Sequence, residues 1–228
     1  MSAARGGSLV SIPSGAVMLE GVLDVPDKAA GVVVFSHGSG SGRHSPRNRY
    51  VAQELRGAGL ATLLLDLLTL EEDTDYEMRF DIELLTERLG DAVRFVRQDA
   101  GTQSLPVGLF GASTGAASAL RVAAAAPDLV QAVVSRGGRP DLTGDQALSR
   151  VKAPTLLIVG GRDHGVIELN QAAQRLLQCE KAVAIVSGAT HLFEEPGTLE
   201  EVARLARDWF LRHLAPVASS ASRDAKQR

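Results

Sequence analysis

The sequence predicts an α/β fold in which a mostly parallel central sheet of about eight strands is flanked by helices on both faces. Six short apolar runs are continuous rather than alternating, which is typical of parallel strands that are covered on both sides. Helical patterns stand between these runs, and such an alternation places helices on both faces of one sheet. With 228 residues, of which 45% are apolar, the chain can build one large domain with a substantial core.

The first two predicted strands differ from the others. Residues 8–13 (SLVSIP) and 17–26 (VMLEGVLDVP) alternate loosely and are expected to pair in an antiparallel manner. The continuous runs that follow are 31–38 (GVVVFSHG), 61–68 (ATLLLDLL), 105–111 (LPVGLFG), 131–138 (QAVVSRGG), 155–161 (TLLIVGG) and 182–188 (AVAIVSG).

Five segments between and after these strands have helical patterns. The first has Ser45 as N-cap, Pro46 at the first helical position, and Gly57 or Gly59 as its end. In the last, the spacing of apolar residues places Trp209 in the core. The five segments are 45–59, 80–98, 114–126, 166–178 and 198–214.

Composition and charge exclude several classes of protein. We expect one domain over residues 1–215 and a disordered polar tail over 216–228. A net charge of −3 and a pI near 6.0 give no reason to expect nucleic acid or an anionic membrane as partner. No apolar stretch reaches the roughly 20 residues that span a bilayer, and residues 1–15 lack the apolar block of a secretory signal. Cys179 is the only cysteine, so the reducing cytoplasm is the expected compartment, and the thiol is interpreted as structural or incidental.

A five-residue motif around Ser113 is the strongest chemical signal in the chain. Gly111-Ala112-Ser113-Thr114-Gly115 directly follows a predicted strand and opens a predicted helix. A sharp strand-to-helix turn strains its central residue, and glycines two positions to either side remove the collisions that bulkier residues would cause. The turn therefore predicts an exposed nucleophilic hydroxyl at a helix N-terminus. The alternative is that Ser113 merely caps the helix.

A serine nucleophile needs a base, which in turn needs an orienting carboxylate. On this kind of sheet the order along the chain is serine, acid, histidine, each beyond a later strand. His191 is the histidine that fits this order. Asp163 follows the predicted strand at 155–161 and is the favoured acid. Asp141, which follows the strand at 131–138, is the alternative.

Backbone amides are expected to form the oxyanion hole. One donor should be the N–H of Thr114, the residue after the nucleophile, and the other should come from the glycine-rich loop SHGSGSGRH. In that loop we favour the N–H of Ser39, with Gly38 and Gly40 as neighbours in the same role. No G-K-[ST] sequence follows the loop, so a nucleotide-binding P-loop is not predicted.

Together these motifs resemble the α/β-hydrolase superfamily. Within it, the chain is similar to the dienelactone hydrolase-like group over about residues 17–214, through SHGSGSGRHSPRNR, LFGASTGAA, SRGGRPDL and GATHLFEEPG. The resemblance implies the α/β-hydrolase fold and functional positions at Ser113, Asp163 and His191. One departure is that dienelactone hydrolases proper use a cysteine nucleophile where this chain has Ser113, so the dienelactone substrate is not carried over.

Arginines near the predicted site raise the question of an anionic substrate. Arg136 and Arg139 follow a central strand at the edge where ligands bind and are tentative substrate-binding residues; a structural ion pair is the alternative. The cluster of Arg43, His44, Arg47 and Arg49 could attract an anion or simply form a solvated helix start. The short acidic segment over residues 66–85 leaves no room for a large lid, which favours small substrates.

These features predict a carboxylesterase-like serine hydrolase of small esters or lactones, with a small-molecule substrate, no cofactor and no metal. Two alternatives are an acyltransferase with the same site and a non-catalytic binding protein on the same fold. Whether the chain is a monomer or a homodimer is left open.

Overall fold

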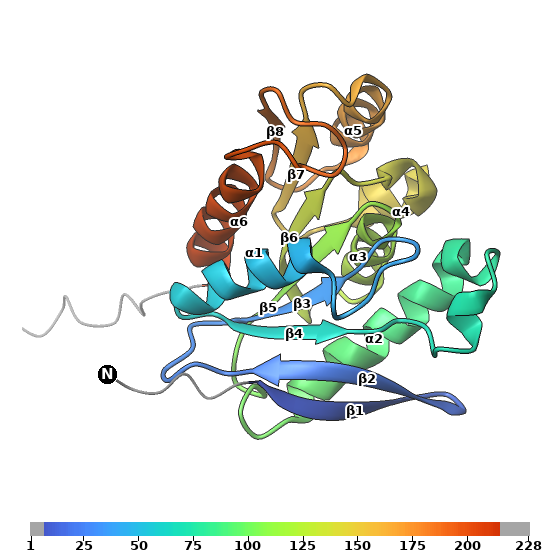
Figure 1. Cartoon of the computed structure of the whole chain (residues 1–228), viewed down its shortest axis with the longest axis vertical. Coiled ribbons are helices and arrows are strands. Elements are labelled where there is room, and N and C mark those ends of the chain that lie inside the picture. The colour runs from blue at the N-terminus through green and yellow to red at the C-terminus, as the bar shows by residue number, and fades with distance from the viewer. Residues whose placement is uncertain (1–6, 215–228) are drawn as a thin grey trace, which may run out of the picture.

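The computed structural model describes residues 7–214 and confirms the predicted α/β-hydrolase fold, a mostly parallel eight-stranded sheet between helices (Figure 1). The predicted tail over residues 216–228 lies outside the described residues. The strands are β1 (Ser8–Ser14), β2 (Val17–Asp24), β3 (Val32–Ser36), β4 (Ala61–Leu65), β5 (Val107–Ala112), β6 (Val130–Arg136), β7 (Thr155–Gly160) and β8 (Lys181–Val186). The helices are α1 (Pro46–Gly57), α2 (Ile82–Gln98), α3 (Thr114–Ala125), α4 (Asp145–Arg150), α5 (His164–Leu176) and α6 (Thr198–Leu214), with 3-10 turns η1 (Glu72–Thr74), η2 (Met78–Phe80) and η3 (Pro140–Thr143).

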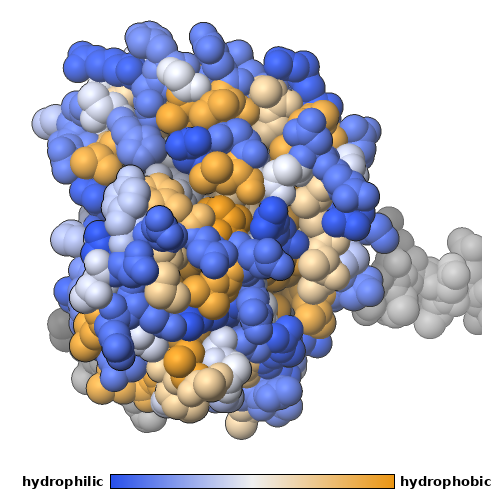
Figure 2. All heavy atoms as spheres, turned by 90° about the vertical axis from the view of Figure 1, so that its right-hand side faces the viewer, coloured by the Kyte–Doolittle hydropathy of each residue, from blue (hydrophilic) through white to orange (hydrophobic). Residues whose placement is uncertain are grey.

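The strand order across the sheet is β1-β2-β4-β3-β5-β6-β7-β8. The β1–β2 and β2–β4 pairs are antiparallel, and every pair from β4 to β8 is parallel. The chain reverses direction across the sheet at β3, so ligands are expected at the edge where the parallel strands end. Figure 2 views the molecule from the side toward which β4 points in Figure 1, and shows apolar side chains in a broken band surrounded by hydrophilic ones.

Each face of the sheet is covered by its own layer of helices (Figure 1). Helices α1 and α6 pack on one face, where Phe35, Phe110 and Phe210 are fully buried. Helices α2, α3 and α5 cover the other face with an aliphatic core. Because alternate residues of a central strand enter opposite layers, continuous apolar runs are required, as the sequence predicts.

Helix α1 begins as predicted. Ser45 is its N-cap and accepts a hydrogen bond from the Asn48 N–H (3.4 Å), and Pro46 occupies the first helical position. The helix ends at Gly57, and Gly59 two residues later has a φ of +83°, a conformation that favours glycine. Trp209 is buried in α6 and donates to the Pro154 carbonyl (3.3 Å).

The structure differs from the sequence-based expectation at two places. Strand β8 was expected to be covered on both faces, but it is the edge strand of the sheet, and Ile185 is 46% exposed. The short helix α4 was not predicted, because six residues are too few for a helical period to be distinguished. No helix within residues 7–214 is long and apolar enough to cross a lipid bilayer.

Candidate active site

Ser113 stands at a strained bend between β5 and α3, with φ +50° and ψ −122°. The two glycines of the motif make this bend possible. A Cβ at Gly111 would lie 2.5 Å from the Ala116 Cα, and a Cβ at Gly115 would lie 2.3 Å from the Ser36 carbonyl oxygen. Both contacts are with backbone and cannot be relieved by a side-chain rotation, so any larger residue would displace the bend.

The bend is anchored to the end of β6 by two backbone hydrogen bonds. The Ser113 N–H donates to the Arg136 carbonyl (3.1 Å), and the Arg139 N–H donates to the Ser113 carbonyl (3.0 Å). Both backbone polar groups of Ser113 are therefore satisfied, and its hydroxyl is left for a side-chain partner.

The structure brings Ser113, His191 and Asp163 into one hydrogen-bonded line. The His191 Nε2 lies 3.4 Å from the Ser113 Oγ, and the His191 Nδ1 lies 2.7 Å from the Asp163 Oδ2. Asp163 is the N-cap residue of α5 beyond β7, and His191 lies in the loop beyond β8. The hydroxyl–imidazole contact is at the long end of the range for a hydrogen bond.

The alternative acid, Asp141, is held elsewhere. Its two carboxylate oxygens accept from the Arg139 Nε and Nη2 at 2.8 and 2.7 Å. This ion pair also answers the question raised at Arg139, whose guanidinium is occupied by a protein carboxylate rather than free for a substrate. Asp141 in turn raises the pKa of the Arg139 guanidinium.

The loop that carries His191 is fixed by buried and strained residues. Phe193 is 1% exposed and has a φ of +56°, an unusual conformation for a bulky residue. The Arg136 guanidinium lies over its ring, 5.9 Å from the centroid. The Thr190 N–H donates to the Glu195 carboxylate (3.1 Å), which closes the loop on the other side of His191.

Arg136 is a buried cation without a carboxylate partner. Its side chain makes no ion pair and no hydrogen bond within residues 7–214, and its buried Nε has no acceptor. Burial and, secondarily, the nearby charge of Arg47 lower the pKa of Arg136 to about 10. The carboxylate of Glu194 forms an ion pair with Arg47 (3.2 Å) and not with Arg136. An unpaired buried charge is costly, and an anion at this place would relieve the cost.

The loop after β3 lies against the nucleophile, as the sequence predicts, but its amides are arranged differently. A Cβ at Gly38 would lie 3.0 Å from the Ser113 Cβ and 3.8 Å from its Oγ. The Ser39 N–H, predicted to face the substrate, donates to the Thr114 Oγ1 (3.0 Å). As the first residue of α3, Thr114 has no intrahelical acceptor for its own N–H, which is available at the N-terminus of the helix.

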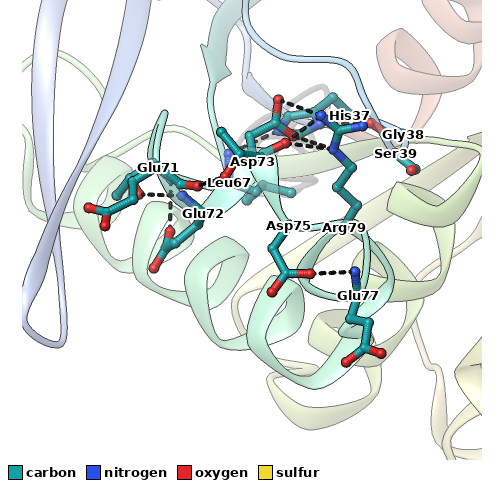
Figure 3. A network of polar contacts seen from close by, with 12 residues as sticks. His37, Gly38, Ser39, Leu67, Glu71, Glu72, Asp73, Asp75, Glu77 and Arg79 are labelled. Carbon is teal, nitrogen blue, oxygen red and sulfur yellow. Dashed lines mark hydrogen bonds and ion pairs between the residues drawn. The ribbon is translucent and has the colours of Figure 1, made fainter.

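A polar network behind this loop was not predicted from the sequence (Figure 3). The buried His37 accepts a hydrogen bond from the Leu67 N–H at Nε2 (2.9 Å), and its Nδ1 lies 3.0 Å from the Gly38 carbonyl oxygen. Burial lowers the pKa of His37 against the opposing effects of the Gly38 hydrogen bond, Asp66 and Asp73. His37 is therefore neutral near pH 7. The network was not predicted because the sequence alone does not show that His37 is buried.

The segment between β4 and α2 forms the wall of a cleft beside the loop. The cleft has a volume of about 460 Å³ and is lined by Ser39, Gly40, Arg47, Leu68 and Thr69, among others. The buried Arg88 holds the segment through hydrogen bonds from its guanidinium to both carboxylate oxygens of Glu72 (2.6 Å each).

Across residues 7–214, no three His, Cys, Asp or Glu side chains gather as metal ligands.

Comparisons with known proteins agree with this architecture. The model of the dienelactone hydrolase family matches residues 19–215. The chain belongs to the dienelactone hydrolase family. A crystal structure of a dienelactone hydrolase from Anabaena variabilis is 54% identical, with a TM-score of 0.90, and covers 92% of this chain and 99% of that one.

Two further relatives extend the comparison. Est1E from Butyrivibrio proteoclasticus shares the fold at 16% identity, with a TM-score of 0.77 over 91% of this chain and 98% of its own. A Mycobacterium tuberculosis protein provisionally named a phosphoribosyl transferase is 61% identical over 206 residues, which are 90% of this chain. These residues are 46% of that protein, so the chain spans about half the length of the curated relatives it matches first.

Proposed function

We propose that this member of the dienelactone hydrolase family hydrolyses carboxylic esters or lactones through an acyl-enzyme on Ser113. The carrying observation is the hydrogen-bonded line from Ser113 through His191 to Asp163. A hydroxyl becomes a competent nucleophile only when a base accepts its proton, and the line supplies that base in the required orientation.

In the first half of the reaction, the Ser113 Oγ attacks the carbonyl carbon while its proton passes to the His191 Nε2. The π electrons of the carbonyl move onto its oxygen, and Asp163 stabilises the imidazolium through Nδ1. When the intermediate collapses, the bond to the alcohol oxygen breaks and His191 returns the proton to that oxygen. Water repeats the sequence on the acyl-enzyme and releases the carboxylic acid and free Ser113.

The surroundings of the triad favour small substrates with a negatively charged group. The segment over residues 66–81 contributes only two 3-10 turns, so this segment does not form a large lid over the site. Arg136 supports an anionic substrate, because it is buried beside the bend at Ser113 and its side chain has no hydrogen bond or ion pair within residues 7–214. The Anabaena relative, a dienelactone hydrolase, makes lactones the first substrates to test.

The longer Mycobacterium tuberculosis relative does not change this proposal. Its name describes a protein of which this chain matches 46%. The groups gathered at the strand ends here suit acyl transfer to water, and no phosphoribosyl transfer is proposed for them.

A substrate screen with a matched variant tests the proposed function. Purified protein and its Ser113→Ala variant are assayed on esters, lactones and thioesters of small acids, and both are labelled with a fluorophosphonate. We expect turnover and labelling by the wild type alone, with equal melting temperatures. Turnover by the variant at the wild-type rate would overturn the assignment of Ser113.

A further inference from the structure

The hydrogen bond between Ser39 and Thr114 leaves one proton without an acceptor. The Thr114 Oγ1 accepts from the Ser39 N–H, so one of its lone pairs is used. The hydroxyl proton itself has no acceptor among the hydrogen bonds within residues 7–214, although Thr114 is 3% exposed. A buried donor without a partner is unfavourable, and here it belongs to the residue that follows the nucleophile.

His37 determines the direction of the hydrogen bonds that lead to this proton. The Leu67 N–H can only donate, so the His37 Nε2 is the acceptor and the proton of the neutral ring is on Nδ1. That proton is donated to the Gly38 carbonyl. The Gly38 carbonyl and the Ser39 N–H belong to one planar peptide group, which is thus held at both ends.

The resulting chain of donors runs in one direction toward the bend at Ser113. Figure 3 shows its first part, Leu67, His37, Gly38 and Ser39. Leu67 donates to His37, His37 donates to the Gly38–Ser39 peptide, and this peptide donates to the Thr114 hydroxyl. At its far end, the Arg88 guanidinium donates to the Leu67 carbonyl (2.8 Å) and fixes the position of Leu67. Hydrogen bonds in series strengthen one another, so the final O–H is a better donor than an isolated threonine.

We propose that the Thr114 hydroxyl is the second donor of the oxyanion hole, beside the Thr114 N–H, and that His37 is a positioning residue that acts through the Gly38–Ser39 peptide. This inference rests on the proposed function, because the acceptor of the Thr114 hydrogen bond is the substrate oxygen that becomes negative when Ser113 attacks a carbonyl. Thr114 keeps its proton throughout; the hydrogen bond shortens as charge develops and relaxes when the carbonyl re-forms. The Ser39 N–H then contributes indirectly rather than by touching the substrate.

The isosteric substitution Thr114→Val tests the hydroxyl, with Thr114→Ser as the matched control that keeps it. We expect kcat for an ester to fall about 100-fold in Thr114→Val with KM changed less than threefold, because loss of one oxyanion donor acts on the transition state. Thr114→Ser should stay within about fivefold of the wild type. Melting temperatures and stoichiometric fluorophosphonate labelling show whether each variant is folded, and Thr114→Ala replaces Thr114→Val if the latter is not.

Two results would overturn the inference. One is a Thr114→Val protein with at least half of the wild-type kcat, provided that Ser113→Ala is inactive; an active Ser113→Ala would instead overturn the proposed function. The other concerns His37→Gln, expected to lower kcat three- to tenfold alone and to add nothing in Thr114→Val, since both act through one proton. Fully multiplicative effects in the double variant would show that His37 acts elsewhere. The control is His213→Asn, a partly buried histidine at the C-terminal end of α6 that packs on Trp209.

Discussion

The Nδ1 atom of His191 lies 2.7 Å from the Asp163 Oδ2, and these two residues come from loops beyond β7 and β8 that are 28 positions apart. The contact orients the imidazole so that Nε2 faces Ser113, 3.4 Å away. A carboxylate at Nδ1 selects the tautomer in which Nε2 can accept a proton, so the pair prepares His191 to act as a base.

Replacement of Asp163 should therefore impair catalysis without unfolding the protein. In Asp163→Asn we expect kcat for the best ester to fall about 10³- to 10⁴-fold with a small change in KM, because the wrong tautomer is favoured. Steady-state kinetics with Asp141→Asn as control measure this. Asp141 pairs with Arg139, so its variant should retain activity; the reverse order of effects would make Asp141 the acid.

The bend at Ser113 should not tolerate a side chain at Gly115. A Cβ there would lie 2.3 Å from the Ser36 carbonyl and 2.4 Å from that of His37, so Gly115→Ala must displace β3 or α3. We expect a loss of roughly 3 kcal/mol or more in the free energy of unfolding, measured by urea titration. The control is Gly57→Ala, where nothing lies within 4 Å and the helix should gain roughly 0.5–1 kcal/mol. Equal stability of the Gly115 and Gly57 variants would contradict the model of the bend.

Arg136 should discriminate substrates by charge. In Arg136→Gln we expect KM for a carboxylate-bearing ester to rise at least tenfold, while KM for its neutral methyl analogue changes less than threefold. Arg139→Gln, which removes only an exposed ion pair with Asp141, should leave both values near those of the wild type. If the two substrates were affected equally by Arg136→Gln, the residue would serve the Phe193 loop rather than an anion.

Stability should depend on pH through Glu72. The Arg88 guanidinium lowers the pKa of Glu72 to about 2, so its charged form is favoured in the folded state. A lowered folded-state pKa means that the stabilisation is complete above the ordinary value near 4.5 and is lost as the pH falls toward 2. Glu72→Gln should cost about 2 kcal/mol at pH 7, because it leaves the buried Arg88 unpaired.

Urea titrations between pH 7 and pH 3 measure this dependence. The gap in unfolding free energy between wild type and Glu72→Gln should narrow below about pH 4.5. Glu87 lies on the exposed side of α2, the helix that carries Arg88, and Glu87→Gln should show no such gap. A constant gap down to pH 3 would mean that the Glu72–Arg88 pair does not carry the pH dependence.

The sequence by itself determined the order of strands and helices, and with it the family and the fold. Runs such as 32–35 and 107–112 contain no polar side chain, and this pattern is typical of strands that are buried on both faces. The sequence also placed Ser113, a later acid and His191 beyond successive strands. Parallel topology gathers such positions at one edge, so their nearness, though not their hydrogen bonds, follows from the sequence.

Only the tertiary structure decided which groups touch. Asp163 rather than Asp141 reaches His191, because Arg139 captures the carboxylate of Asp141. The Ser39 N–H donates to the side chain of Thr114, 75 positions away. His37, which comes before the nucleophile in the sequence, holds the same peptide group through the Gly38 carbonyl. Hydrogen bonds depend on distances and angles within a few tenths of an ångström, and packing between distant segments sets these, whereas local sequence sets only the elements that pack.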